Sequence, residues 1–138
     1  RIGNNTSIQD NVTIHGKKTI IGNNVTIGHG AIVHGAIIGN NVLIGMNATI
    51  LDGAEIEDWS IIAAGSLISP RTKIESESLV KGVPGKVVRK LEQKDKDYIV
   101  DAYQNYLEKI KSKSKEIPKS PSPVQVSRLE PNVFKATV

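Results

Sequence analysis

Residues 14–35 read IHGKKTIIGNNVTIGHGAIVHG, and the spacing of apolar residues in this stretch sets the pattern for the first part of the chain. An isoleucine or valine returns every six residues, except for a seven-residue step from Ile14 to Ile21 and a five-residue step from Val33 to Ile38, which cancel. Counting outward in both directions gives fourteen such positions: Ile2, Ile8, Ile14, Ile21, Ile27, Val33, Ile38, Ile44, Ile50, Ile56, Ile62, Ile68, Ile74 and Val80.

A period of six fits no single face of an α-helix, whereas short strands joined by tight corners can keep it. Three hexads then make one triangular turn of a parallel β-helix, and the repeated isoleucine or valine fills its narrow interior. The motif Ile-Gly-Asn-Asn supports this interpretation, because it recurs at residues 2–5, 21–24 and 38–41, about one three-hexad turn apart. Asparagine tolerates the left-handed backbone region, so these residues suit the same corner of successive turns. The alternative is a set of β-hairpins, but a repeat this regular disfavours it.

The hexads resemble those of the hexapeptide-transferase superfamily, whose β-helix is left-handed, and the expected handedness rests on that resemblance. We therefore predict an all-β protein: a left-handed parallel β-helix of hexapeptide repeats over residues 1–91, followed by a C-terminal α-helix within residues 92–115. Residues 116–138 contain four prolines and are predicted to form an extended or disordered tail.

The helix is predicted over about residues 94–113. Asp95 or Asp97 can cap its start, and lysines gather in its last turn. Its apolar residues follow at three- and four-residue spacing: Ile99, Tyr103, Tyr106 and Ile110. Trp59 falls on an outward position of its hexad and is a candidate for the surface that the helix covers.

Composition bounds the function classes. The chain has no cysteine, no signal peptide and no apolar run near the roughly 20 residues that cross a bilayer, so we expect a cytoplasmic protein that does not enter a membrane. Its net charge of +4 belongs to the C-terminal part, and no nucleic-acid motif accompanies it, so nucleic acid is not an expected partner. The chain opens in repeat register, which suggests that N-terminal turns are missing.

The three histidines are the candidate metal ligands. His15 and His34 each follow the first residue of their hexad, and their hexads are one full turn apart, so they should lie on one face, roughly 4.8 Å apart as neighbouring strands are. His29 is the third residue of its hexad, on the preceding face. A neighbouring subunit could therefore supply it, giving a homotrimer with a metal at each interface. The alternatives are three unrelated surface histidines, or a metal that only stabilises the assembly.

The stretch IQDNVTIHG…IGNNVTIGHGAIVHGAIIGNNVLIGMNATILDGA resembles the γ-class carbonic anhydrases, and the resemblance covers about residues 2–91. It implies that His15, His29 and His34 bind a catalytic metal, two from one subunit and one from its neighbour, in a homotrimer that interconverts carbon dioxide and bicarbonate. It also implies that Gln9 contacts the metal-bound water and that Asp10 pairs with an interface arginine. Zinc is the expected ion, with iron or cobalt as alternatives, because imidazole suits all three.

The chain departs from that family in three places. The family's Arg-Gly-Asp segment, one turn before Ile8, would precede the first residue here, so Asp10 would lack its arginine partner. The loop after His15 is Gly-Lys-Lys-Thr, basic and short, where more active members carry an acidic loop with a proton-shuttling glutamate. Ser7 also replaces an asparagine. These departures bear on the rate of hydration rather than on metal binding.

Two other function classes remain open. The first is a CoA-dependent acyltransferase, in which one histidine acts as general base, and the Gly-Val-Pro-Gly-Lys exit at residues 82–86 is similar to one found in that superfamily. Metal-bearing thioesterases or carnitine-linked proteins belong with this class, since their histidines would look the same. The second is a non-enzymatic trimeric scaffold with a vestigial metal site.

Overall fold

The computed structural model describes residues 1–116, with side chains up to residue 113, so the tail predicted from residue 117 onward lies outside the described residues. The coil consists of short strands, most of them two residues long, and the first described unit of the chain, residues 1–107, contains all of them. The strands are β1 (Ser7–Ile8), β2 (Thr13–His15), β3 (Ile20–Ile21), β4 (Thr26–Ile27), β5 (Ile32–His34), β6 (Ile37–Ile38), β7 (Leu43–Ile44), β8 (Thr49–Ile50), β9 (Glu55–Ile56), β10 (Ile61–Ile62), β11 (Leu67–Ile68), β12 (Lys73–Ile74), β13 (Ser78–Lys81) and β14 (Lys86–Lys90).

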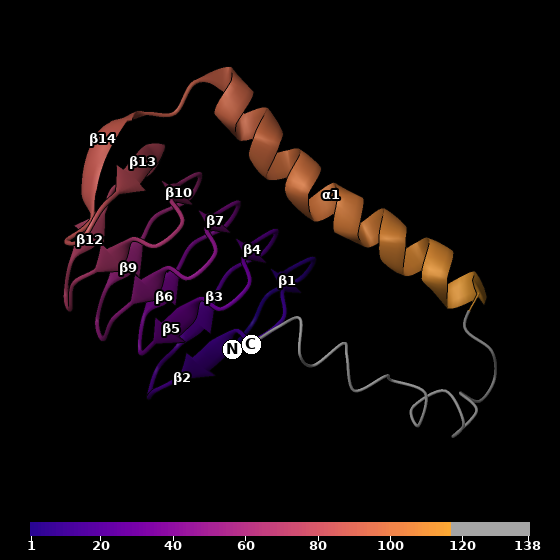
Figure 1. The fold of residues 1–138 in the computed structure, drawn as a ribbon, viewed down its shortest axis with the longest axis horizontal. Helices are drawn as coiled ribbons and strands as arrows, with labels where there is room; N and C mark the ends of the chain where they lie inside the picture. The colour runs from indigo at the N-terminus through magenta and orange to yellow at the C-terminus, as the bar shows by residue number, and fades with distance from the viewer. Residues whose placement is uncertain (117–138) are drawn as a thin grey trace, which may run out of the picture. The chain divides into compact units, whose positions relative to one another are not determined.

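Every third strand pairs in parallel, which gives the coil three flat faces. One face has the order β1-β4-β7-β10-β13, the second β2-β5-β8-β11 and the third β3-β6-β9-β12. Figure 1 shows the rungs of the first face stacked in sequence order. The predicted parallel β-helix of hexapeptide repeats is therefore confirmed.

The repeated isoleucine or valine forms the core, as the spacing predicts. Ile27, Ile44 and Ile62 stack in register on one face, and none is more than 1% exposed. At the first rung Ile8 is 41% exposed. Burial of each such side chain stabilises the fold by about 1.5–3 kcal/mol, so the middle rungs contribute most of the hydrophobic stabilisation.

The corners place residues in the left-handed backbone region. One corner repeats on five rungs, and its φ angles lie between 54° and 59° at Asn5, Asn24, Asn41, Trp59 and Glu77. The asparagine amides bond from rung to rung, with Asn5 Nδ2 3.3 Å from Asn24 Oδ1 and Asn24 Nδ2 3.2 Å from Asn41 Oδ1. The corner role predicted for the Asn-Asn pairs is thus confirmed. For a bulky side chain such as Trp59 this conformation costs about 1–2 kcal/mol.

The chain leaves the coil through a hairpin that the sequence pattern did not predict. β14 turns back and pairs antiparallel with β13, across the loop that contains Pro84. The hexad count stops at Val80, and a strand that joins a coil only at its edge needs no inward-pointing residue every six positions. Residues 86–90 therefore carry no signal of the repeat.

The helix α1 (Gln93–Glu116) begins one residue before the predicted start and is capped from within its first turn. The Glu92 N–H donates to Asp95 Oδ2 at 2.7 Å, which is the reciprocal half of a capping box. The Arg89 guanidinium donates to both oxygens of the same carboxylate, at 2.7 and 3.0 Å. That ion pair, helped by the Glu92 N–H, holds the pKa of Asp95 well below its usual range.

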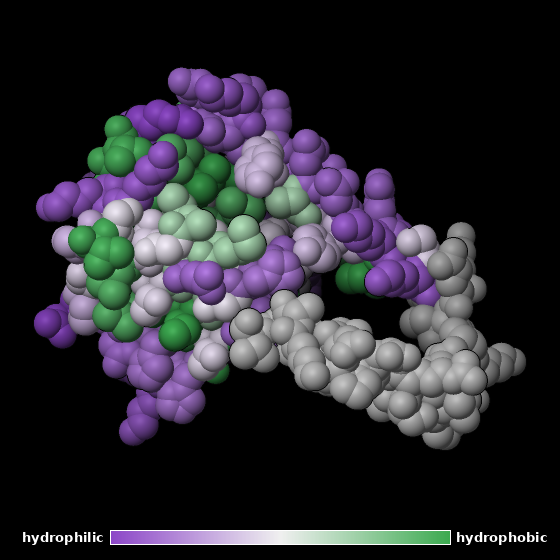
Figure 2. All heavy atoms as spheres, viewed as in Figure 1, coloured by the Kyte–Doolittle hydropathy of each residue, from purple (hydrophilic) through white to green (hydrophobic). Residues whose placement is uncertain are grey.

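The first part of α1 packs on the face formed by β7, β10 and β13. Ile99 is 1% exposed and forms a second apolar cluster with Ile61 and Leu91. Trp59 packs against this cluster, so its predicted place under the helix is confirmed. Figure 2 shows hydrophobic residues grouped on the visible face of the coil, whereas α1 presents mainly hydrophilic ones. None of the described residues forms a helix with the length and hydropathy of a membrane span.

Candidate functional site

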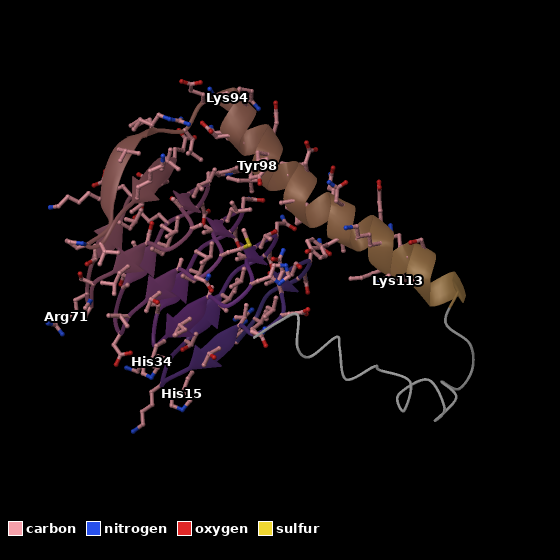
Figure 3. All side chains as sticks on the ribbon, in the orientation of Figure 1. His15, His34, Arg71, Lys94, Tyr98 and Lys113 are labelled. Carbon is pink, nitrogen blue, oxygen red and sulfur yellow. The ribbon has the colours of Figure 1, made fainter. Side chains whose placement is uncertain are left out.

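His15 and His34 lie side by side at the ends of β2 and β5 (Figure 3). They are paired residues of adjacent rungs, as the hexad count predicts. His15 Nδ1 is 3.1 Å from His34 Nε2, and the ring centroids are 5.1 Å apart with the planes tilted by 36°. The predicted register is therefore confirmed, while metal binding by the pair stays a prediction.

Asp52 on the next rung contacts His34, a feature that the sequence reasoning missed. Its Oδ1 meets the Nδ1 atom of His34, on the side of the ring away from His15. Gly35 makes room for this contact, because a Cβ at that position would lie 2.7 Å from Asp52 Oδ1. The available signal was an acidic residue eighteen positions after His34, about one turn later.

A hollow of about 550 Å³ surrounds this pair. It combines cations and carboxylates with the two imidazoles, since its lining includes His15, Lys17, Lys18, His34, Asp52 and Glu55. Glu55 adds a second carboxylate beside Asp52, whereas the charged residues of the loop after His15 are both lysines. A carboxylate is thus present in the hollow, although it comes from the strand β9 and not from that loop.

His29 and Gln9 belong to a second pocket. His29 follows β4 at the corner between the first and second faces, and it is exposed. Both residues line a pocket of about 450 Å³ that does not include His15 or His34. The predicted separation of His29 from the stacked pair is therefore confirmed within one chain. Asp10 lines neither pocket, and its backbone carbonyl accepts a hydrogen bond from the Gly30 N–H at 3.0 Å.

The stacked pair fits a metal ion, and the fit can be tested on distances. A tetrahedral ion with bonds of 2.0–2.1 Å holds two nitrogen ligands about 3.3 Å apart, close to the 3.1 Å between the ring nitrogens of His15 and His34. A carboxylate on the far nitrogen of a ligating histidine, as Asp52 provides for His34, is the usual second-shell partner. Among the described residues no group of three or more metal-binding side chains gathers within one chain.

Comparison with known proteins relates the chain to hexapeptide-repeat transferases. The family model for the bacterial transferase hexapeptide (six repeats) matches residues 18–52 and 35–70. A hexapeptide transferase family protein from Anaplasma phagocytophilum is 38% identical, with a TM-score of 0.74, over 76% of this chain and 63% of that one. A putative acetyltransferase from Bacillus cereus is 38% identical, with a TM-score of 0.73 and the same coverage of both chains.

A hexapeptide-repeat acetyltransferase from Vibrio cholerae shares the fold alone, at 23% identity and a TM-score of 0.55, over 67% of this chain and 62% of that one. No curated protein matches the sequence significantly. The chain spans just under two thirds of the length of the Anaplasma and Bacillus proteins. The repeat and these likenesses support one assignment: the chain is a hexapeptide-repeat protein with a left-handed β-helix fold. These three relatives are named as transferases, so the finer resemblance to the γ-class carbonic anhydrases is a hypothesis.

Proposed function

We propose that the chain is a metal-dependent enzyme that hydrates carbon dioxide to bicarbonate, in the manner of the γ-class carbonic anhydrases, with its active centre between subunits of a homotrimer. The observation that carries this proposal is the stacked pair of His15 and His34, with the Asp52 carboxylate behind His34. An oriented imidazole pair of this kind can serve as a metal site, because its two ring nitrogens lie about as far apart as two ligands of one ion.

The placement of the histidines favours a ring of three subunits. His15 and His34 end their strands at one corner of the triangular coil, and His29 lies at the corner before it. A heterologous contact joins one patch of a subunit to a different patch of the next, and a closed ring of such contacts repeats the same interface. In a threefold ring, each interface then brings one His29 to one pair of His15 and His34.

The chain's own residues have separate roles in the proposed reaction. The Asp52 carboxylate accepts the Nδ1–H of His34, which fixes the tautomer whose Nε2 lone pair is free to ligate. Gln9, which lines the same pocket as His29, can hold the attacking water by its side-chain amide. When bound, a divalent metal ion lowers the pKa of a water ligand toward 7 and so supplies the nucleophile at neutral pH. Glu55 offers a carboxylate that can pass the released proton to solvent, and Lys17 and Lys18 attract the bicarbonate product.

Acyl transfer is the second candidate function, and the likeness to the Bacillus cereus protein, a putative acetyltransferase, favours it over carbon dioxide hydration. The contact between His34 and Asp52 also suits this chemistry, because a carboxylate that orients an imidazole makes it a better general base. In that case the histidine would take a proton from the acceptor hydroxyl or amine, and no metal would be needed.

One experiment separates the two functions. The protein is purified anaerobically, loaded with zinc, iron(II) or cobalt(II), and assayed by stopped-flow for carbon dioxide hydration and by thiol release for acetyl-CoA turnover with a panel of hydroxyl and amine acceptors. We expect metal-dependent hydration that His34→Ala abolishes and that Gln104→Ala, on the exposed side of α1, leaves unchanged. Acetyl transfer that survives chelation of the metal would establish the second candidate instead, and the absence of both activities would indicate a scaffold.

A further inference from the structure

The hairpin of strands β13 and β14 lies at the end of the coil opposite β1 (Figure 1). Its residues 81–90 read KGVPGKVVRK, with four cationic side chains and no carboxylate. The proposed centre uses none of them, because the linings of the two pockets described above contain no residue of this segment. The hairpin is therefore a separate surface of the first described unit.

Two lysines of the hairpin face each other across the strands. Lys81 and Lys86 are direct partners in the antiparallel register of β13 and β14. Like charges in such a position repel each other and destabilise a sheet. Both residues are exposed, and neither belongs to an ion pair among the described residues, whereas Arg89 of β14 pairs with Asp95. The two lysines therefore present positive charge that an anionic partner would stabilise.

Three valines of the same hairpin are exposed to solvent. Val83, in the loop between the two strands, is 70% exposed, which exceeds every other large hydrophobic side chain among the described residues. Val87 and Val88, on β14, are 52% and 53% exposed. Apolar groups that lie together on a surface, with polar residues around them, are typical of interaction sites. The hairpin combines such groups with the positive charge of Lys81 and Lys86.

A lipid bilayer with anionic headgroups matches both properties of the hairpin. Its phosphates attract lysines that lie near the surface, and the boundary between headgroups and acyl chains accepts aliphatic side chains. A free phosphate ion would satisfy Lys81 and Lys86 but would leave the valines in water. An acidic protein would need an apolar hollow shaped to the loop, whereas a fluid bilayer adapts to it.

We propose that the β13–β14 hairpin docks the protein reversibly on a bilayer surface that contains anionic phospholipids. Lys81 and Lys86 meet headgroup phosphates, and Val83 enters the boundary between headgroups and acyl chains. This contact is peripheral, so it needs no helix that spans the bilayer. It depends neither on a metal ion nor on the hydration reaction proposed above, because its residues lie outside the candidate centre.

The first test measures co-sedimentation of the full chain with vesicles of phosphatidylcholine alone and of phosphatidylcholine with phosphatidylglycerol in equal parts. We expect binding to the mixed vesicles only, and loss of that binding as sodium chloride screens the charges. Lys81→Ala and Lys86→Ala should each weaken the partitioning about fivefold at low salt. Lys113→Ala, near the end of α1, changes the net charge by the same amount and should have a much smaller effect.

The second test locates the loop in the bilayer. The chain has no cysteine, so Val83→Cys gives a single attachment point for an environment-sensitive fluorophore. Its emission should shift to shorter wavelength on mixed vesicles, whereas the same label at Gln104→Cys, on the exposed side of α1, should not shift. Val83→Thr keeps the branched shape but is less apolar, so it should weaken binding about threefold or more.

Several results would overturn the proposal. They are equal binding to both kinds of vesicle, no binding to the mixed ones, or equal effects of Lys81→Ala and Lys113→Ala. Displacement from the mixed vesicles by inorganic phosphate at constant ionic strength would show a site for a free anion. Tighter binding of polyglutamate than of the mixed vesicles would show that the partner is an acidic protein. None of these readouts involves catalysis or a metal, so failure of the hydration assay leaves the binding result independent.

Discussion

The division of the histidines between two corners predicts that two inactive variants restore each other when their subunits mix. His29→Ala leaves the stacked pair of His15 and His34 intact, whereas His34→Ala leaves only His29 available to a neighbour. In the proposed ring, each interface takes His29 from one subunit and the pair from the next. Neither variant alone has a complete interface, but a ring that contains both kinds of subunit does.

The expected recovery follows from this geometry. In an equal and random mixture, an interface draws His29 from a His34→Ala subunit half the time and the pair from a His29→Ala subunit half the time, so about one quarter of the interfaces are complete. In a ring selected to contain both variants, about one third of the interfaces are complete, because one of the three subunit junctions has the right order. Bound metal and hydration should recover in the same proportions.

The assay uses two affinity tags on co-expressed variants, sequential purification of doubly tagged rings, and measurement of bound metal and of carbon dioxide hydration. The matched control pairs His15→Ala with His34→Ala, both of which damage the same corner. This mixture contains no interface with all three histidines, so it should recover nothing. Recovery in the control, or none in the mixture of His29→Ala and His34→Ala, would refute the shared site.

Three further predictions concern stability and the surroundings of the site. Ile44→Ala, at a residue 1% exposed, should lower the free energy of unfolding by about 2–5 kcal/mol in urea titrations, and Ile8→Ala, at a residue 41% exposed, should cost less than half as much. Asp52→Ala should weaken metal affinity about 10–100-fold in chelator competition because His34 loses its partner, while Asp52→Asn should retain part of the affinity through its amide oxygen. The pKa of Asp95 is held below its ordinary 3.8 by the neighbouring guanidinium, so its stabilisation is present above that pH and is lost as the pH falls toward the lower folded-state pKa. Thermal melts from pH 5 downward should therefore decline more steeply for wild type than for Asp95→Asn.

Each of these predictions has a contrary outcome. Equal losses of unfolding free energy in Ile44→Ala and Ile8→Ala would mean that the middle rungs do not contribute most of the coil's stability. Metal affinity unchanged in Asp52→Ala would show that the carboxylate does not orient His34. If the melting temperatures of wild type and Asp95→Asn fell in parallel as the pH is lowered, the ionised Asp95 carboxylate would not be stabilising the start of α1.

The repeat made the coil and the histidine register predictable. A residue every six positions must enter a narrow interior, so the count alone placed His15 beside His34 and set His29 apart. The packing of Trp59 was predictable from its outward position in the hexad, because an outward aromatic side chain favours a cover.

The hexad count could not predict contacts that depend on corner geometry or on packing. Asp52 reaches His34 across a space that Gly35 leaves open, since a Cβ at Gly35 would lie 2.7 Å from Asp52 Oδ1. Glu55 joins the same hollow from another strand, although the loop after His15 has no acidic residue. The hexad count also gives no sign that the buried Thr26 hydroxyl lacks a hydrogen-bond partner among the described residues.

Native mass spectrometry of the anaerobically purified protein tests the shared histidine site most directly. The proposed site predicts a trimer that carries about one metal ion per subunit and that loses all of its metal in His29→Ala as well as in His34→Ala. A monomer that retains the metal, or a trimer whose metal content is unchanged by His29→Ala, would contradict a centre built from His15 and His34 of one subunit and His29 of the next.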